Sequence, residues 1–116
     1  MSVTGEMEER IAKVVAEFEE RQMGLRPSSI LVNLLDNALF VVLEGVSSPA
    51  EKECAGTDES HDLLEHYHGR LFAAGREALE TEIQSILGRT VKHSSLMVDP
   101  ISGTGVMQFA LGEPNK

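Results

Sequence analysis

Cysteine and aromatic residues are scarce in this sequence. Cys54 is the single cysteine in 116 residues, Trp is absent, and aromatic side chains make up 4% of the chain. A lone cysteine cannot form a disulfide within the chain, so Cys54 is expected to be a small filler in a reducing compartment rather than a nucleophile. The few aromatic side chains predict an aliphatic core and argue against stacking on nucleic-acid bases.

Positive charge is also in short supply. The 10 Lys and Arg residues face 19 Asp and Glu residues, which gives a net charge of −9. That sign is wrong for holding a phosphate backbone, so we expect no nucleic-acid partner. The acidic residues concentrate in segments 6–20 and 51–65, and such runs are typical of solvated helix faces.

Long apolar runs are missing. The longest uninterrupted one covers residues 38–43, whereas a membrane-spanning helix needs roughly 20 apolar residues. The first ten residues, "MSVTGEMEER", have neither the basic start nor the apolar stretch of a signal peptide. We therefore expect no transmembrane segment and a cytoplasmic location. A chain with 41% hydrophobic and 25% charged residues predicts one globular domain, residues 1–116, with an ordered core at about 4–112.

Helical periodicity is present in two long segments. Apolar residues recur at steps of three and four in residues 4–23 and 59–87, as amphipathic helices require. Gly24 and Gly88 follow these segments, where glycine commonly ends a helix. A short helix is predicted from the capping-box sequence "SPAE", residues 48–51, and either Thr57 or Asp58 is expected to cap the long helix.

Strand patterns fill the remaining segments in pairs. Residues 30–35 and 39–44 are joined at Asp36 and Asn37, and residues 91–98 and 106–111 are joined through "DPISGTG". Both pairs predict β-hairpins. The chain is therefore predicted to be an α+β fold in which two helix-strand-strand units form a four-stranded antiparallel sheet, with the helices packed on one face.

The predicted strands leave one face of the sheet apolar and uncovered. That face carries Leu31, Leu35, Val106 and Ala110, or the opposite set if the register differs by one residue. Exposed aliphatic surface of this kind favours self-association. We therefore expect a homodimer with Leu31 and Leu35 at its interface.

Candidate reactive residues are few. His61, Glu65 and His68 have the spacing of metal ligands on one helix face, but the acidic residues around them favour a solvated, exposed face, and no metal is expected. Glu44 is interpreted as a residue at a strand end. Because no triad, zinc-protease or nucleotide fingerprint occurs in the sequence, we expect no catalytic residues, no cofactor and no enzymatic activity.

Several short motifs together resemble a known bacterial family. They are "GLRPSSILVNLLDNALFVVLEGVSSPAEKECA", then "ILGRTV", "MVDPISGTG" and "VMQFAL", and the pattern is similar to the short MpsC-like family. The residues that match its motifs are Gly24, Pro27, Leu43, Gly45, Pro49, Glu51, Gly88 and Asp99, together with Arg70 or Arg76 in the long helix. "GLRP" departs from the family's commoner Gly-x-Gly-Pro form at Arg26.

The resemblance implies a function that composition alone does not. It implies a non-enzymatic accessory protein that works with membrane proteins of a Na+-translocating, membrane-potential-generating or inorganic-carbon uptake system. It brings no catalytic residues. The alternative hypothesis is a small ligand-binding or regulatory module with a pocket between the long helix and the sheet.

Overall fold

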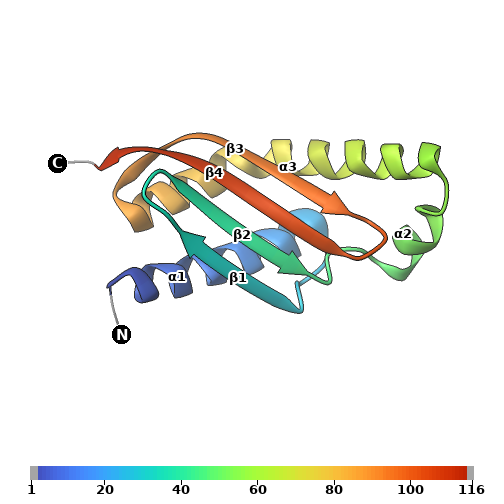
Figure 1. The fold of residues 1–116 in the computed structure, drawn as a ribbon, viewed down its shortest axis with the longest axis horizontal. Coiled ribbons are helices and arrows are strands. Elements are labelled where there is room, and N and C mark those ends of the chain that lie inside the picture. The colour runs from blue at the N-terminus through green and yellow to red at the C-terminus, as the bar shows by residue number, and fades with distance from the viewer. Residues whose placement is uncertain (1–2, 115–116) are drawn as a thin grey trace.

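The computed structural model describes residues 3–114 (Figure 1). Their elements, in chain order, are α1 (Val3–Phe18), the π-helical turn η1 (Glu19–Met23), β1 (Ser29–Leu34), β2 (Ala38–Glu44), α2 (Pro49–Cys54), α3 (Asp58–Leu87), β3 (Arg89–Asp99) and β4 (Thr104–Pro114). This is the predicted α+β arrangement of two helix-strand-strand units. The main difference lies in the first helix, which was predicted as one α-helix to residue 23 but changes to a π-helix after Phe18.

Local sequence signals explain where the helices begin and end. Gly24 and Gly88 adopt left-handed backbone angles, with φ of 83° and 66°, immediately after η1 and α3. Ser48 caps α2 through the complete capping box with Glu51, and Thr57 is the residue that caps α3. Each signal acts over a few neighbouring residues, which is why the sequence predicted it.

The sheet is antiparallel with the strand order β1-β2-β4-β3. The two hairpins therefore meet through β2 and β4, and β1 and β3 are the edge strands. The first hairpin turns at Asp36 and Asn37 as predicted, closed by a hydrogen bond from the Leu35 amide to the Ala38 carbonyl. β3 and β4 are longer than predicted, and the register of β3 against β4 shifts between Arg89 and His93.

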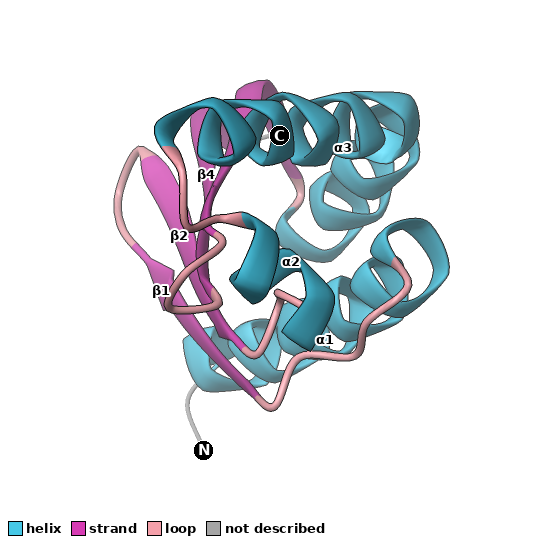
Figure 2. Ribbon diagram, turned by 90° about the vertical axis from the view of Figure 1, so that its right-hand side faces the viewer, coloured by secondary structure: helices cyan, strands magenta, loops and turns pink. Residues whose placement is uncertain are grey.

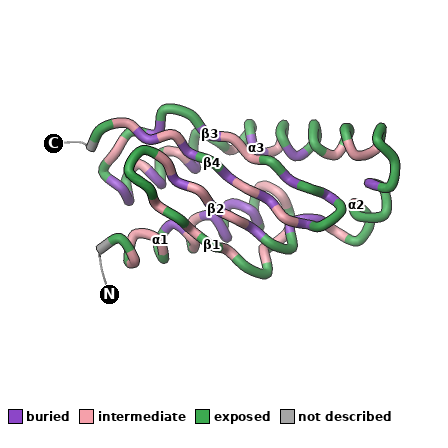
Figure 3. The backbone as a smooth tube through the Cα atoms, viewed as in Figure 1, coloured by how far each residue is buried: buried purple, intermediate pink, exposed green. Residues whose placement is uncertain are grey.

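Both long helices lie on the same side of the sheet, so the molecule has two layers (Figure 2). Buried and less buried positions alternate along β2 and β4 (Figure 3), because successive strand side chains point to opposite faces. The buried core comes from both layers; its main members are Ile11, Val15, Phe18, Leu39, Val41, Leu43, Phe72, Leu79, Ile83, Met107 and Phe109.

The register decides which side of the sheet stays uncovered. Ile30, Val32 and Leu34 pack against the core, whereas Leu31 is 64% exposed and Leu35 is 46% exposed. Of the two alternatives from the sequence, the set that contains Leu31 and Leu35 is the one that faces away from the helices.

The two long helices pack closely where η1 passes α3. The rings of Phe18 and Phe72 meet edge to face with centroids 5.8 Å apart. Gly75 makes this approach possible, since a Cβ at that position would lie 2.8 Å from Phe18 and 2.9 Å from Gln22. The amide of Gln22 also donates to the Leu71 carbonyl at 3.0 Å, which fixes the crossing point.

α3 is longer than the sheet that it covers. Its 30 residues correspond to about 45 Å of helix, close to the 49 Å long axis of the molecule. Its first turns extend past the sheet towards α2 (Figure 1). The start of α3 therefore overhangs the sheet, and α2 lies beside it.

A buried carboxyl group lies in the π-helical turn. Glu19 is 1% exposed, and its Oε1 atom has no hydrogen-bond partner among the described residues. Burial raises the pKa of Glu19 from 4.5 to about 7, because a carboxylate loses hydration in the protein interior. The run of Glu residues around this position gave no sign that one of them is buried.

Replacement of Glu19 by Gln should change how stability depends on pH. The raised pKa means that the folded state binds the proton of Glu19 more tightly than the unfolded state does. The stability that this proton binding contributes is complete below pH 4.5 and is lost as pH rises through 7. We expect the free energy of unfolding of the Glu19→Gln protein to rise by about 3 kcal/mol relative to that of the unmodified protein as pH increases from 4.5 to 8. Urea unfolding of both proteins at these pH values measures the difference, and a difference independent of pH would contradict the assignment.

Candidate functional site

The turn between β3 and β4 forms one wall of the candidate site. Asp99 ends β3, and its Oδ1 atom accepts a hydrogen bond from the Ile101 amide at 3.0 Å, while its carbonyl accepts from the Gly103 amide at 2.8 Å. The Ile101 amide, together with Ser102 and the nearby His61, lowers the pKa of Asp99 below its ordinary value, although some desolvation opposes this. The carboxylate is thus held charged at the tip of the hairpin.

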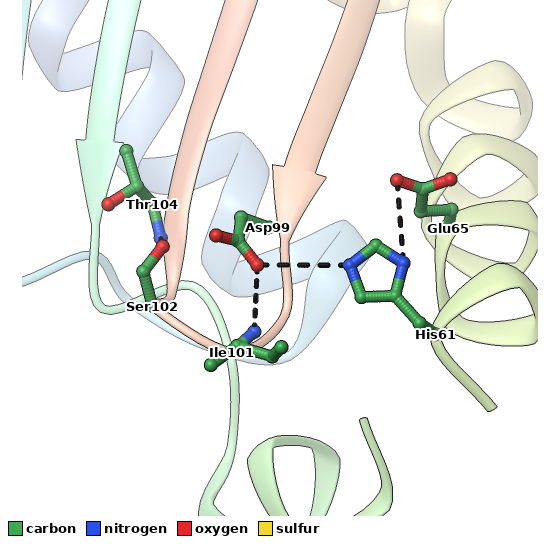
Figure 4. Close-up of polar contacts among 6 residues, drawn as sticks. All are labelled: His61, Glu65, Asp99, Ile101, Ser102 and Thr104. Atoms are coloured by element: carbon green, nitrogen blue, oxygen red, sulfur yellow. Dashed lines mark hydrogen bonds and ion pairs between the residues drawn. The ribbon is translucent and has the colours of Figure 1, made fainter. Parts of the chain in front are cut away.

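α3 supplies the opposite wall. The Thr57 hydroxyl accepts from the Ser60 amide at 3.2 Å and starts the helix, which places His61 in its first turns. Figure 4 shows the His61 ring between two carboxylates. Its Nε2 atom lies 3.9 Å from Asp99 Oδ1, and its Nδ1 atom lies 3.7 Å from Glu65 Oε1.

A cleft of about 750 Å³ lies between these walls. Its lining includes His61 and Glu65 of α3, Val98 and Asp99 of β3, and Ser102 of the turn. Neither Glu44 nor Cys54 is among the lining residues. Glu44 instead accepts a hydrogen bond from the Thr104 hydroxyl at 2.9 Å, at the end of β2 where the sequence placed it.

His68, the third member of the predicted histidine pattern, does not reach this cleft. It is 5% exposed, and its Nε2 atom lies 2.5 Å from Glu51 Oε2. The interpretation of His61, Glu65 and His68 as one exposed face is therefore wrong for His68. A signal was available in the sequence, because His68 precedes the buried Phe72 by one helical turn. The neighbouring Tyr67 is 54% exposed.

Glu51 joins α2 to α3. One of its oxygens accepts from the Ser48 amide at 3.0 Å and the other faces His68. Burial alone would raise the pKa of Glu51, but hydrogen bonds from Ser48 and His68 outweigh it and lower that pKa. This family-motif residue thus has two structural roles, capping one helix and docking it on another.

The other motif residues surround turns and the core. Leu43 is fully buried, and Pro49 is the first residue of α2. Gly45 has a φ of 75°, and a Cβ there would lie 2.8 Å from the Ser28 hydroxyl. Gly24, Pro27 and Gly88 lie between elements. Of the eight motif residues, the fold brings Asp99 alone into the cleft lining.

Comparison with known proteins identifies the family. The family model described as "Na+-translocating membrane potential-generating system (MpsC)" matches residues 3–113. The chain belongs to the MpsC family. It is also 28% identical over 107 residues to the uncharacterized protein YbcI of Bacillus subtilis, a match that covers 92% of this chain and 86% of that protein.

No solved structure matches the chain significantly. Within residues 3–114, none of the helices combines the length and the apolar character needed to cross a membrane.

Loss of the His68 side chain should destabilise this MpsC-family protein. Because Glu51 would keep a partly buried charge without its partner, we expect His68→Ala to reduce the free energy of unfolding by about 2–3 kcal/mol. The matched control is His66→Ala, an exposed residue of the same helix, which should change it by less than about 0.5 kcal/mol. Chemical denaturation measures both, and equal effects would show that the Glu51 contact contributes little.

Proposed function

We propose that this protein is a non-enzymatic accessory protein of the cytoplasm that acts by docking to other proteins. The observation that carries the proposal is an uncharged, solvent-facing sheet surface in a chain whose net charge is −9. The family description supports a partner in a Na+-translocating or related membrane transport system.

The docking surface consists of two rows of side chains that cross all four strands. The register aligns Leu31, Val42, Val106 and Met97 in one row, and Asn33, Phe40, Gln108 and Ser95 in the next. None of these eight residues is charged. We call this set the open face; at the two ends of its apolar row, Leu31 is 64% exposed and Met97 is 74% exposed.

A second copy of the chain is the proposed occupant of the open face. The apolar row is aliphatic from one sheet edge to the other. A twofold axis can therefore pack this row against the same row of a second copy, so that apolar side chains meet only apolar side chains. Two copies that each carry −9 repel each other least where their contact surface has no charge. Sheets that pack face to face are separated by about 10 Å, a distance that side chains of this size fill.

The carboxylates outside the open face suit a different contact. A strongly acidic surface attracts a basic one and speeds the encounter with it. We propose that these carboxylates direct the dimer to a basic cytosolic surface of its membrane partner. The open face and the acidic surface therefore have separate roles, one in self-association and one in partner binding.

A second candidate function is ligand binding in the cleft between α3 and the β3–β4 hairpin. The specific observation in its favour is the volume of about 750 Å³, which falls within the range of small-molecule sites. Residues from two distant parts of the chain converge on it. The cleft and the open face share Met97 and Val106, so a partner on the open face would also cover part of the cleft.

Charge on the open face should prevent dimer formation. We expect light scattering of the unmodified protein at micromolar concentration to report about twice the chain mass of 12.7 kDa, and Leu31→Glu to reduce this to one chain or to cause aggregation. Leu63→Glu is the matched control, because Leu63 of α3 is also 64% exposed but lies outside the open face. A monomeric mass for the unmodified protein would refute the proposal.

The proposed membrane partner can be sought directly. Affinity purification of the tagged full chain from its own host should enrich a membrane transport or ion-translocating protein. Because the contact is attributed to charge, a wash at about 1 M salt should release that protein. At this salt concentration the Debye length is about 3 Å, so attraction between exposed charges is largely screened. Enrichment of no membrane component at low salt would remove the support for this partner.

A further inference from the structure

One turn of α3 gathers three potential metal ligands beside the cleft. His61, Asp62 and Glu65 each offer one ligand atom, and these atoms all lie within 4.8 Å of one another. The separation of 3.7 Å between His61 Nδ1 and Glu65 Oε1 is too long for a good hydrogen bond. Ligands about 2.0–2.1 Å from a tetrahedral Zn²⁺ lie about 3.4 Å apart, so a shift of a few tenths of an ångström would bring the two atoms to that distance.

The second nitrogen of His61 has a partner suited to orienting it. Asp99 Oδ1 lies 3.9 Å from Nε2, which is beyond hydrogen-bond distance, so the two groups must approach by roughly 1 Å before Asp99 can orient the ring. The Ile101 amide holds that carboxylate in place. In metal sites, a ligating histidine almost always directs its other ring nitrogen to such an acceptor. With its proton on Nε2, His61 presents the lone pair of Nδ1 towards Glu65.

Charge at this position also favours a cation. Asp62, Glu65 and Asp99 bring three carboxylates close to one imidazole, and no Lys or Arg of residues 3–114 forms an ion pair with any of them. By comparison, Glu20 on η1 is paired with Arg26 at 2.7 Å. The group around His61 is therefore left with negative charge that no basic side chain neutralises.

We propose that His61, Asp62 and Glu65 bind a divalent transition-metal ion of the zinc class, and that Asp99 orients the His61 ring through the ring nitrogen that does not face the metal. The nitrogen donor favours zinc-class ions over Mg²⁺ and Ca²⁺, which prefer oxygen ligands alone. The inference rests on the second candidate function, ligand binding in the cleft, and gives it a ligand class. It replaces the expectation from the sequence that this helix face holds no metal, because Asp99 is brought to it only by the fold.

The test uses Zn²⁺ and Co²⁺ with the purified full chain. Zn²⁺ should raise the melting temperature, and Co²⁺ should give the visible absorption bands of a low-symmetry nitrogen and oxygen site. We expect His61→Ala to abolish both signals. We expect Asp99→Asn to weaken Zn²⁺ affinity by about 10- to 100-fold, as loss of a group that orients a metal ligand does. Mg²⁺ should produce no comparable shift.

The matched control is His66→Ala, which removes an exposed histidine of the same helix that is not a member of the ligand group and should leave both signals unchanged. Melting curves without metal check that each variant folds. Absence of a Zn²⁺ or Co²⁺ signal in the folded protein, or equal loss in the His61 and His66 variants, overturns the proposal. If nucleotides or bicarbonate stabilise the metal-free protein while Zn²⁺ does not, ligand binding in the cleft stands and the metal assignment fails.

Discussion

Two helices on one side of a four-stranded sheet leave its other side without cover, and much of this structure follows from that constraint. The helices bury Leu39, Val41 and Leu43 of β2 completely, while the intervening residues of the same strand remain partly exposed. Because side chains alternate along a strand, a strand that is apolar on both faces needs two covers. This chain provides one, and the proposed second cover is another molecule.

The length of α3 is the second constraint. A 30-residue helix extends past a sheet whose shortest strand has six residues, so its first turns cannot be held by the sheet alone. One polar contact that holds them is the hydrogen bond between His68 and Glu51 of α2, and nearer the helix start His61 lies 3.9 Å from Asp99 of β3. The family-motif residues Glu51 and Asp99 thus lie on either side of the overhang, although they are far apart in the sequence.

Polar atoms buried inside this protein are concentrated in a few places. Glu19 Oε1, Ser47 Oγ and His68 Nδ1 are buried without a partner among the described residues, and each such atom costs free energy unless water reaches it. Ser94 avoids this cost by donating to Glu80 of α3. Glu19 lies in η1, which packs against α3, and His68 lies in α3 beside α2, whereas Ser47 lies in the connection between β2 and α2.

The sequence by itself determined the elements of this fold and the pairing of its strands into two hairpins. Helix ends at Gly24 and Gly88, the capping box at Ser48 and the turn at Asp36 and Asn37 were all predictable, since each depends on contacts within a few residues. The sequence also predicted the alternation of Ile30 and Leu31, because the period of a strand is local. It left open which of the two faces is covered.

Only the tertiary structure decided the strand order, the face that stays open and the partners of the polar side chains. Asp99 reaches His61, and Glu51 reaches His68, through the packing of the hairpins and α2 against α3. Likewise, Glu19 is buried while its neighbour Glu20 is exposed, in a turn that packs against α3. Such outcomes depend on contacts between distant segments, and no pattern within a few residues encodes them.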